Sequence, residues 1–383
     1  MRLNSMEALN PFVFTQPVGP DDLIDRDDES ERLLALAEGG HAVRLSAPRR
    51  YGKTSLLRRI GRDADKIGMN YVEVDFYGVL SEIEVAERLE DGYAVLRSKA
   101  GELARSAIRT LRPGIRVGGG PVRVDSRPRV EERTKRLLTG LLDLPVRLFE
   151  RTGTRTLVAF DEFQALLAVG PGIDGLFRSR IQRHGDAASY IFAGSHPGLM
   201  AQLFARQERP FFGQARAFEL DPLEDGDIAE YVGERFEKTR RSVGTALEPL
   251  LDLAAGHPQR AMLLAHQLWE QTPFEGEADA ECWQRTLVTV FAEQDEALRA
   301  AWDSLETKEQ AVYAALAVGG SGLFAERTLT RFNLSKSSAR YAREALVRGG
   351  QVRKIDSRWL PVDPLLARWA IELQHNGGED LLR

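Results

Sequence analysis

Residues 46–55 have the types and spacing of a loop that cradles phosphate groups, since they match the pattern G-x-x-x-x-G-K-[ST] at every fixed position but the first. Ala47 stands where that pattern has its first glycine. Gly52 would let the backbone approach the phosphates, Lys53 would place a charge at the β- and γ-oxygens, and Thr54 would offer a hydroxyl to Mg²⁺. We expect nucleotide contacts from Ala47, Pro48, Arg49, Arg50, Tyr51, Gly52, Lys53, Thr54 and Ser55.

A second segment supplies two carboxylates. Residues 157–160 are apolar and are followed directly by Asp161 and Glu162. At the end of a buried strand, Asp161 can hold Mg²⁺ directly or through water, and Glu162 can orient the water that attacks a terminal phosphate. Strand ends that face helix N-termini are where ligands bind in parallel sheets. An ordinary strand with solvated acids is the alternative, and the phosphate loop makes it the weaker one.

These side chains need a framework of alternating strands and helices. Short apolar segments predict strands, and amphipathic segments between them predict helices. The expected strands are Ala42–Ser46, Tyr71–Phe76, Thr156–Phe160, Tyr190–Ala193 and Ala217–Leu220, and the expected helices are Asp28–Glu38, one from about Thr54, Leu80–Leu111 and Glu132–Arg151. The segment Pro121–Val130 fits a hairpin or an irregular loop. Such alternation favours an α/β fold with a parallel sheet covered on both faces.

After Pro222 the pattern becomes helical. The expected helices are Asp227–Arg240, Leu247–Ala255 and Gln259–Gln271, with a linker at Pro273–Asp279. We therefore divide the chain into a core at 1–221, a helical lid at 222–300, a C-terminal unit at 301–374 and a tail at 375–383. A chain of 383 residues is long enough for two to three domains.

The C-terminal unit has the pattern of a winged helix. Helices are expected at Leu305–Val318, Glu326–Arg331 and Lys336–Arg348, and Ser335 is a suitable N-cap for the third. Two short strands, Val352–Ile355 and Arg358–Val362, would form the wing. The third helix would present cations to a DNA major groove, and the wing would contact phosphates. The candidate DNA contacts are Lys336, Arg340, Arg343 and Arg353.

The charge distribution leaves the partner of this unit open. The whole chain has a net charge of −5, but residues 327–358 carry nine basic residues against Glu344 and Asp356, a net of +7. Residues 97–129 carry another +7. Basic patches on an acidic chain are possible nucleic-acid footprints. Contact with a protein partner, intramolecular regulation and a solvated helix face are the alternatives.

Composition excludes several classes of protein. One cysteine excludes an intrachain disulfide and cysteine-based metal sites, and no apolar run reaches the roughly 18 residues that span a bilayer. Residues 1–15 contain one arginine and no long apolar stretch, so they do not fit a secretory signal. A cytoplasmic location without membrane contact is the expectation.

The sequence resembles the STAND-type branch of AAA-like P-loop ATPases, specifically archaeal and bacterial ATPases with a C-terminal winged helix that are related to origin-recognition ATPases. The resemblance extends from about Asn10 to Trp369. The segments that carry it are Asn10-Pro11-Phe12, Leu23-Ile24-Asp25-Arg26, Ala47–Ser55, Val158–Gln164, Gly194-Ser195, Pro210-Phe211-Phe212-Gly213, Gly256-His257-Pro258, Leu334–Ser338 and Asp363-Pro364-Leu365. It implies ATP and Mg²⁺ as ligands, slow ATP hydrolysis, and a switch that acts through assembly or the winged helix.

The resemblance also implies roles for single residues. Ile24 and Arg26 match the segment near the adenine, and Ser195 matches a first sensor of the γ-phosphate or attacking water. Pro258 matches the motif that places the lid over the nucleotide, and Arg260 matches a second sensor. Alternatives from the residues alone are a helix-entry turn around Arg26, a strand-terminal turn at Ser195 and a surface arginine at Arg260.

One position departs from the family pattern. Many relatives carry an arginine finger shortly after the Pro-Phe-Phe-Gly segment, and Gln214 stands there in this chain. Arg209 and Arg216 flank it and are candidate substitutes in a neighbouring copy. A finger is worth roughly 10³–10⁵ in rate, so an isolated chain should hydrolyse ATP slowly. The sequence thus favours an ATP-driven switch that contacts DNA or a partner, with a nucleotide-gated protein scaffold as the alternative.

Overall fold

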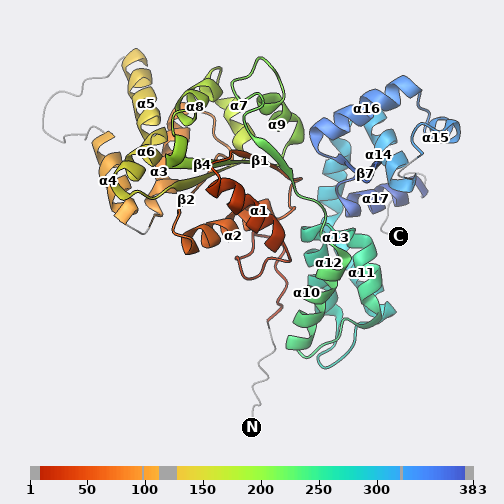
Figure 1. The fold of residues 1–383 in the computed structure, drawn as a ribbon. Coiled ribbons are helices and arrows are strands. Elements are labelled where there is room, and N and C mark those ends of the chain that lie inside the picture. Colours follow the sequence, from red (N-terminus) through yellow and green to blue (C-terminus); the bar gives the residue numbers. More distant parts are fainter. Residues whose placement is uncertain (1–8, 97–98, 112–126, 320–321, 376–383) are drawn as a thin grey trace, which may run out of the picture.

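Five parallel strands form the centre of the N-terminal half, in the order β2-β3-β4-β1-β5 (Figure 1). They are β1 (Val43–Ser46), β2 (Asn70–Asp75), β3 (Thr156–Asp161), β4 (Ala188–Gly194) and β5 (Arg216–Glu219). The computed structural model describes residues 9–96, 99–111, 127–319 and 322–375. All five predicted strands are confirmed, each within two residues of its expected ends.

Alternate residues of the strands face opposite sides of the sheet, and both sides are buried. Leu157 and Ala159 of β3 join the core on one side, while Val158 and Phe160 join the core on the other. A strand buried on both faces reads as a continuous apolar run, which is why residues 157–160 lack polar alternation. The sheet therefore holds its strand ends rigidly.

Helices cover both faces. One side packs against α1 (Asp27–Glu38) and α2 (Lys53–Lys66), and the other against a larger set of helices that includes a cluster of phenylalanines. The larger set is α3 (Glu82–Ala94), α4 (Lys99–Leu111), α5 (Arg127–Leu142), α6 (Leu144–Thr152), α7 (Leu166–Val169), α8 (Ile173–Ile181) and α9 (Pro197–Phe204). Short 3₁₀ turns lie at η1 (Phe163–Ala165), η2 (Gly185–Ala187) and η3 (Gly244–Ala246).

Two predicted helices were wrong in their continuity. The expected helix at 80–111 is two helices, α3 and α4, which pack against each other. Buried Leu96, Ala100 and Ala104 continue the apolar pattern from α3 toward α4, so the sequence predicted a single helix. The expected helix at 132–151 is α5 and α6, which are separated near Pro145. A proline lacks an N–H group and is best placed in the first turn of a helix. Most of the predicted hairpin or loop at 121–130 lies outside the described residues.

The C-terminal half is helical except for one hairpin. Its elements are α10 (Asp225–Lys238), α11 (Leu247–Ala254), α12 (Pro258–Gln271), α13 (Ala280–Asp303), α14 (Thr307–Gly319), α15 (Glu326–Arg331), α16 (Lys336–Gly349), β6 (Val352–Ile355), β7 (Arg358–Pro361) and α17 (Pro364–His375). Ser335 caps α16, because its hydroxyl accepts the N–H of Ser338 at 3.1 Å. Asp356 and Ser357 both have left-handed backbones, which close the two-residue turn between β6 and β7.

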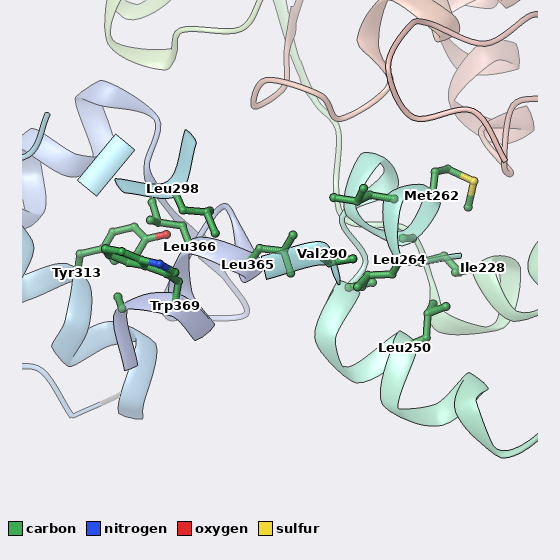
Figure 2. Close-up of a cluster of buried hydrophobic side chains, with 14 of the residues drawn as sticks. Ile228, Leu250, Met262, Leu264, Val290, Leu298, Tyr313, Leu365, Leu366 and Trp369 are labelled. Atoms are coloured by element: carbon green, nitrogen blue, oxygen red, sulfur yellow. The ribbon is translucent and has the colours of Figure 1, made fainter. Parts of the chain in front are cut away.

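One hydrophobic core runs through this whole half. Figure 2 shows it continuing from Ile228 and Leu250 through Val290 of α13 to Tyr313 and Trp369. The long helix α13 crosses residue 300, where we expected a domain boundary, and it contributes to both parts of the core. We refer to residues 222–303 as the helical unit and residues 304–375 as the C-terminal unit. Within the described residues, no helix is both long and apolar enough to span a membrane.

Candidate nucleotide-binding site

The phosphate loop connects the end of β1 to the start of α2, the context that its function requires. Gly52 precedes α2 with a φ of 80°, a conformation that glycine adopts without strain. Ala47 is buried, and its backbone is not left-handed, so the position needs no glycine. The amide of Ala47 donates to the carbonyl of Gly194 at 3.3 Å, which attaches the loop to β4.

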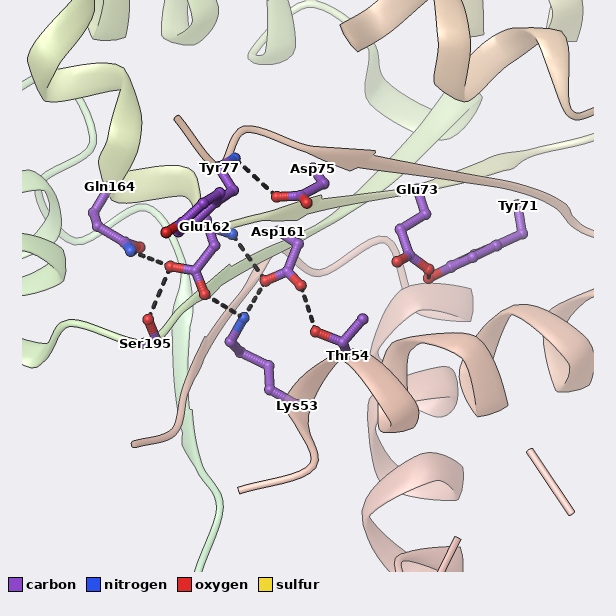
Figure 3. A network of polar contacts seen from close by, with 10 residues as sticks. All are labelled: Lys53, Thr54, Tyr71, Glu73, Asp75, Tyr77, Asp161, Glu162, Gln164 and Ser195. Carbon is purple, nitrogen blue, oxygen red and sulfur yellow. Dashed lines mark hydrogen bonds and ion pairs between the residues drawn. The ribbon is translucent and has the colours of Figure 1, made fainter. Parts of the chain in front are cut away.

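Lys53 lies between the two predicted carboxylates (Figure 3). Its Nζ forms a short ion pair with Asp161 and another of 3.0 Å with Glu162 Oε1. Thr54 Oγ1 donates to the other oxygen of Asp161 at 2.9 Å. The structure therefore brings Lys53, Thr54, Asp161 and Glu162 into one cluster, although 107 or more residues separate the loop from the acids.

Burial and charge act in opposite directions in this cluster. Burial would lower the pKa of Lys53, but the carboxylates of Asp161 and Glu162 outweigh it and raise the pKa. Burial would raise the pKa of Glu162, but the charge of Lys53 and the hydrogen bonds from Lys53, Gln164 and Ser195 together outweigh burial and lower the pKa. Both groups are therefore ionised at neutral pH, and Lys53 screens two carboxylates that would otherwise repel each other.

Two further side chains hold the carboxylate of Glu162. Its Oε2 accepts the hydroxyl of Ser195 at 2.9 Å and a short hydrogen bond from the amide of Gln164. Its φ is 50°, a left-handed conformation that costs energy outside glycine and is often found at functional sites. The structure thus brings Ser195 next to Glu162, and its role as a sensor stays a prediction. Gln164 is not among the predicted site residues. Its position two residues after Glu162 was the only sequence feature that could have indicated this contact.

Thr54 and Asp161 fit a magnesium site. Mg²⁺ in such sites takes one or two protein oxygens and completes its octahedron with phosphate oxygens and water. The hydroxyl and carboxylate lie 2.9 Å apart at the sheet edge beside the phosphate loop. Among the described residues, no group of three or more His, Cys, Asp or Glu side chains could hold a metal ion.

Lys53, Thr54, Glu162 and Ser195 line a cleft of about 1010 Å³, to which the core, the helical unit and the C-terminal unit all contribute. Its charged end holds Lys53, Glu162 and Ser195. Another part is lined by the apolar side chains of Val18, Ile24, Leu223 and Met262, together with Tyr231. A nucleotide with its phosphates at the charged end would place its base against this apolar part.

Most of the other predicted contacts line the same cleft. Pro48, Arg49, Arg50, Tyr51, Gly52, Ser55 and Pro258 do so, with Ile24 and Arg26. Arg26 is buried and is already engaged, since its guanidinium donates to the carbonyl of Asp221 at 2.6 Å and pairs with Glu29. Ala47 and Asp161 are not among the residues that line the cleft. His257 is buried under Tyr51, and burial lowers its pKa to about 4, which fits a structural role.

Arg260 does not lie where a surface arginine or a free sensor would. It is buried, and its guanidinium forms a two-point ion pair with Asp363, immediately before α17. The C-terminal unit also contributes Gly349, Gly350 and Gln351 to the cleft lining. The contribution of the C-terminal unit to the cleft was not predicted, because the only sequence signal for Asp363 was its place in a family resemblance.

The candidate DNA contacts have different surroundings. Lys336 and Arg340 are exposed on α16. Arg343 is half-buried, with its guanidinium 4.8 Å from the centroid of the Trp359 ring. Arg353 corrects our expectation, because it donates to the Leu220 carbonyl at 3.1 Å and to Asp221 at 2.9 Å. In this structure Arg353 joins the C-terminal unit to the core instead of facing solvent. Part of the second basic segment, at 97–98 and 112–126, lies outside the described residues.

The candidate arginine fingers are also distinguished by their contacts. Arg209 pairs with buried Asp174 at 3.1 Å, whereas Arg216 is exposed at the start of the edge strand β5. Arg178 of α8 is not among the predicted arginine fingers, but its guanidinium donates to Gln214 Oε1 at 2.6 Å. An arginine from another part of the sequence therefore lies next to Gln214.

Two solved structures share this fold over nearly the whole chain. A Walker-type ATPase of Pyrococcus abyssi is 18% identical, covering 93% of this chain and 98% of its own, with a TM-score of 0.65. The ORC2 protein of Aeropyrum pernix in its ADPNP–ADP complexes is 14% identical, covering 95% and 96%, with a TM-score of 0.57. No protein-family profile and no curated protein matches the sequence. The similarity confirms the predicted P-loop NTPase fold, with its parallel sheet and flanking helices.

Proposed function

We propose that this protein is a slow ATPase that works as a molecular switch, with Mg²⁺ as its metal. The observation that carries the proposal is the cluster in which Lys53 pairs with Asp161 and Glu162, while Thr54 donates to Asp161. The ATPase fold and the cleft around this cluster support it. Calorimetric titration with ATP and Mg²⁺ tests the proposal, and a folded protein that does not bind ATP would contradict it.

The cluster suggests how binding prepares hydrolysis. Lys53 pairs with both carboxylates, and its single charge offsets part of theirs. The phosphates of ATP compete for the ammonium group, and its movement toward them would free Asp161 and Glu162. Glu162 remains oriented by Ser195 and Gln164, so its carboxylate can accept a hydrogen bond from water in line with the γ-phosphate. Residues Thr54 and Asp161 would hold Mg²⁺, which neutralises charge on the β- and γ-oxygens.

We further propose that the C-terminal unit is a winged helix and is the output of the switch. It lies against the nucleotide cleft, and α16 packs on α9 near Gly198, whose position would clash with the Arg348 carbonyl if it carried a Cβ. A change at the phosphates can therefore alter how this unit is held. The exposed cations of α16 favour duplex DNA as the partner.

Reversing two of these cations should weaken DNA binding. We expect Lys336→Glu/Arg340→Glu to lower affinity for a labelled duplex and to reduce the salt slope by about 1 for each lost phosphate contact. Fluorescence anisotropy at several salt concentrations, with and without ATP, measures both. These residues are preferred to Arg343, whose removal would also disturb packing on Trp359.

Lys135→Glu/Arg136→Glu is the matched control, because it changes the net charge by the same amount and both residues are exposed on α5, which lies at the opposite end of the molecule (Figure 1). If the unaltered protein binds no duplex even at low salt, DNA contact is excluded and the nucleotide-gated protein scaffold becomes the better function. Equal weakening by the control would show that only net charge matters.

Hydrolysis per chain should rise with protein concentration if an arginine of one copy acts on ATP in another. Exposed Arg216 is the preferred candidate, since Arg209 is engaged by Asp174. We expect Arg216→Ala to remove the concentration dependence while the rate at high dilution stays unchanged. Specific activity that is flat over a dilution series, with assembly confirmed by light scattering, would exclude a finger in trans.

A further inference from the structure

The contact between Arg260 and Asp363 joins the helical unit to the C-terminal unit. Arg260 Nε donates to Asp363 Oδ1 at 3.0 Å, Nη2 forms a short bond to Oδ2, and Nη1 donates to Gln294 Oε1 at 3.2 Å. The Arg260 side chain is 5% exposed and that of Asp363 is 28% exposed. A two-point pair between a guanidinium and a carboxylate is among the stronger polar contacts in proteins.

Asp363 is fixed by its own surroundings. Its carboxylate also accepts the N–H of Leu365 at 3.0 Å, and its carbonyl accepts the hydroxyl of buried Tyr313 at 3.2 Å. Burial would raise the pKa of Asp363, but the charge of Arg260 and the hydrogen bonds from Arg260 and the Leu366 backbone contribute to an opposite effect that outweighs burial and lowers the pKa, so the carboxylate is ionised. Arg260 is thus held by a rigid anion that belongs to a different unit of the chain.

This ion pair lies beside the phosphate loop. Asp363 lines the nucleotide cleft, as do His257, Pro258 and Gln259, which begin the helix that carries Arg260. Burial and the nearby charge of Arg260 lower the pKa of Arg50 in the loop. A nucleotide triphosphate in the cleft would bring its terminal phosphate into the same electrostatic environment as the pair.

A second contact joins the C-terminal unit to the core. Arg353 donates to Leu220 and Asp221 of the core, and its guanidinium lies 5.4 Å from the ring centroid of Tyr51. Tyr51 is itself packed against His257, with ring centroids 4.7 Å apart. Two separate contacts therefore hold the C-terminal unit, that of Asp363 with Arg260 and that of Arg353 with the core. We call these contacts the two fastenings, and they can be altered separately.

We infer that Asp363 limits how strongly this site prefers ATP over ADP, because its carboxylate holds the Arg260 guanidinium that would otherwise bind the terminal phosphate of ATP. The inference rests on the proposed function. A γ-phosphate offers Arg260 an anion of higher charge that can also bind a guanidinium at two points. ADP lacks that group and leaves the pair intact, so ATP alone separates Arg260 from Asp363 and removes one fastening of the C-terminal unit.

The test compares AMP-PNP with ADP, each with Mg²⁺, by titration calorimetry on the full chain. Asp363→Asn keeps the shape but weakens the competing anion, so we expect AMP-PNP to bind about tenfold more tightly while ADP changes by less than about threefold. Asp363→Glu retains the carboxylate and should stay near the unaltered protein. Asp221→Asn is the matched control, because it removes the carboxylate of the other fastening and should leave the AMP-PNP to ADP ratio unchanged.

Equal changes for both nucleotides in Asp363→Asn, or no change, would overturn the inference while the proposed function stands. Failure of the unaltered protein to bind either nucleotide would overturn both. If Asp363→Asn does not unfold cooperatively on heating, Arg260→Gln decides, since it should reduce the AMP-PNP to ADP affinity ratio severalfold. A ratio that is unchanged in folded Arg260→Gln would also overturn the inference.

Discussion

Replacing Lys53 with alanine should reduce ATP affinity by about 100-fold, since hydrogen bonds from a charged group contribute roughly 1.5–3 kcal/mol each and Lys53 has no substitute in the cluster. The loss has a second cause. Without the ammonium group, Asp161 and Glu162 repel each other and the incoming phosphates. Titration with a fluorescent ATP analogue measures the affinity, and thermal unfolding shows whether the fold is retained.

Two further variants make this result specific. Lys66→Ala removes an exposed lysine from the end of the same helix, where it pairs with Asp63, and should leave ATP affinity unchanged. Asp161→Ala should weaken binding only when Mg²⁺ is present, since its carboxylate is the proposed metal ligand. Unaltered affinity in both Lys53→Ala and Asp161→Ala would place the nucleotide elsewhere.

Glu162→Gln should separate binding from hydrolysis. The amide keeps the size of the side chain and can still accept the hydroxyl of Ser195, but it loses the charge that orients and polarises the attacking water. We expect single-turnover hydrolysis to fall by about 10²–10³-fold, within the range for loss of a group that accepts a proton, while ATP binding changes little. Rapid-quench measurement of phosphate release provides the rate.

Asp75→Asn is the control for this experiment. Asp75 ends β2 in register with Asp161 and accepts the N–H of Tyr77 at 2.8 Å, which an asparagine can also do (Figure 3). It removes a neighbouring carboxylate without touching the Lys53 cluster. Hydrolysis by Glu162→Gln at the original rate would assign water activation to another residue, and an equal loss in Asp75→Asn would point to a general effect of charge.

The sequence alone was sufficient to predict the strands of the sheet and to propose that Lys53, Thr54, Asp161 and Glu162 form one site. Strands that are buried on both faces need continuous apolar residues, so residues 157–160 were recognisable, and carboxylates directly after such a strand can only lie at its end. The Gly-Lys-Thr segment requires a strand before it and a helix after it, and both are present. These signals are local, since each depends on residues within a few positions of one another.

The continuity of helices was less accessible. The apolar pattern continues from α3 into α4 because residues of both segments pack into the same core, as Leu96 and Ala100 show. Periodicity reports which residues are buried, and it does not report whether the chain reverses direction between them.

Only the tertiary structure decided what the individual arginines do. Arg260, Arg353 and Arg178 have no local partner, and their partners Asp363, Asp221 and Gln214 lie 36 to 132 residues away in the sequence. A guanidinium on a long side chain binds whichever anion or carbonyl the packing of the units brings within reach. The sequence therefore predicted the loop and the carboxylates of the proposed phosphate site, and the packing of the C-terminal unit against the cleft determined which charges are already paired there.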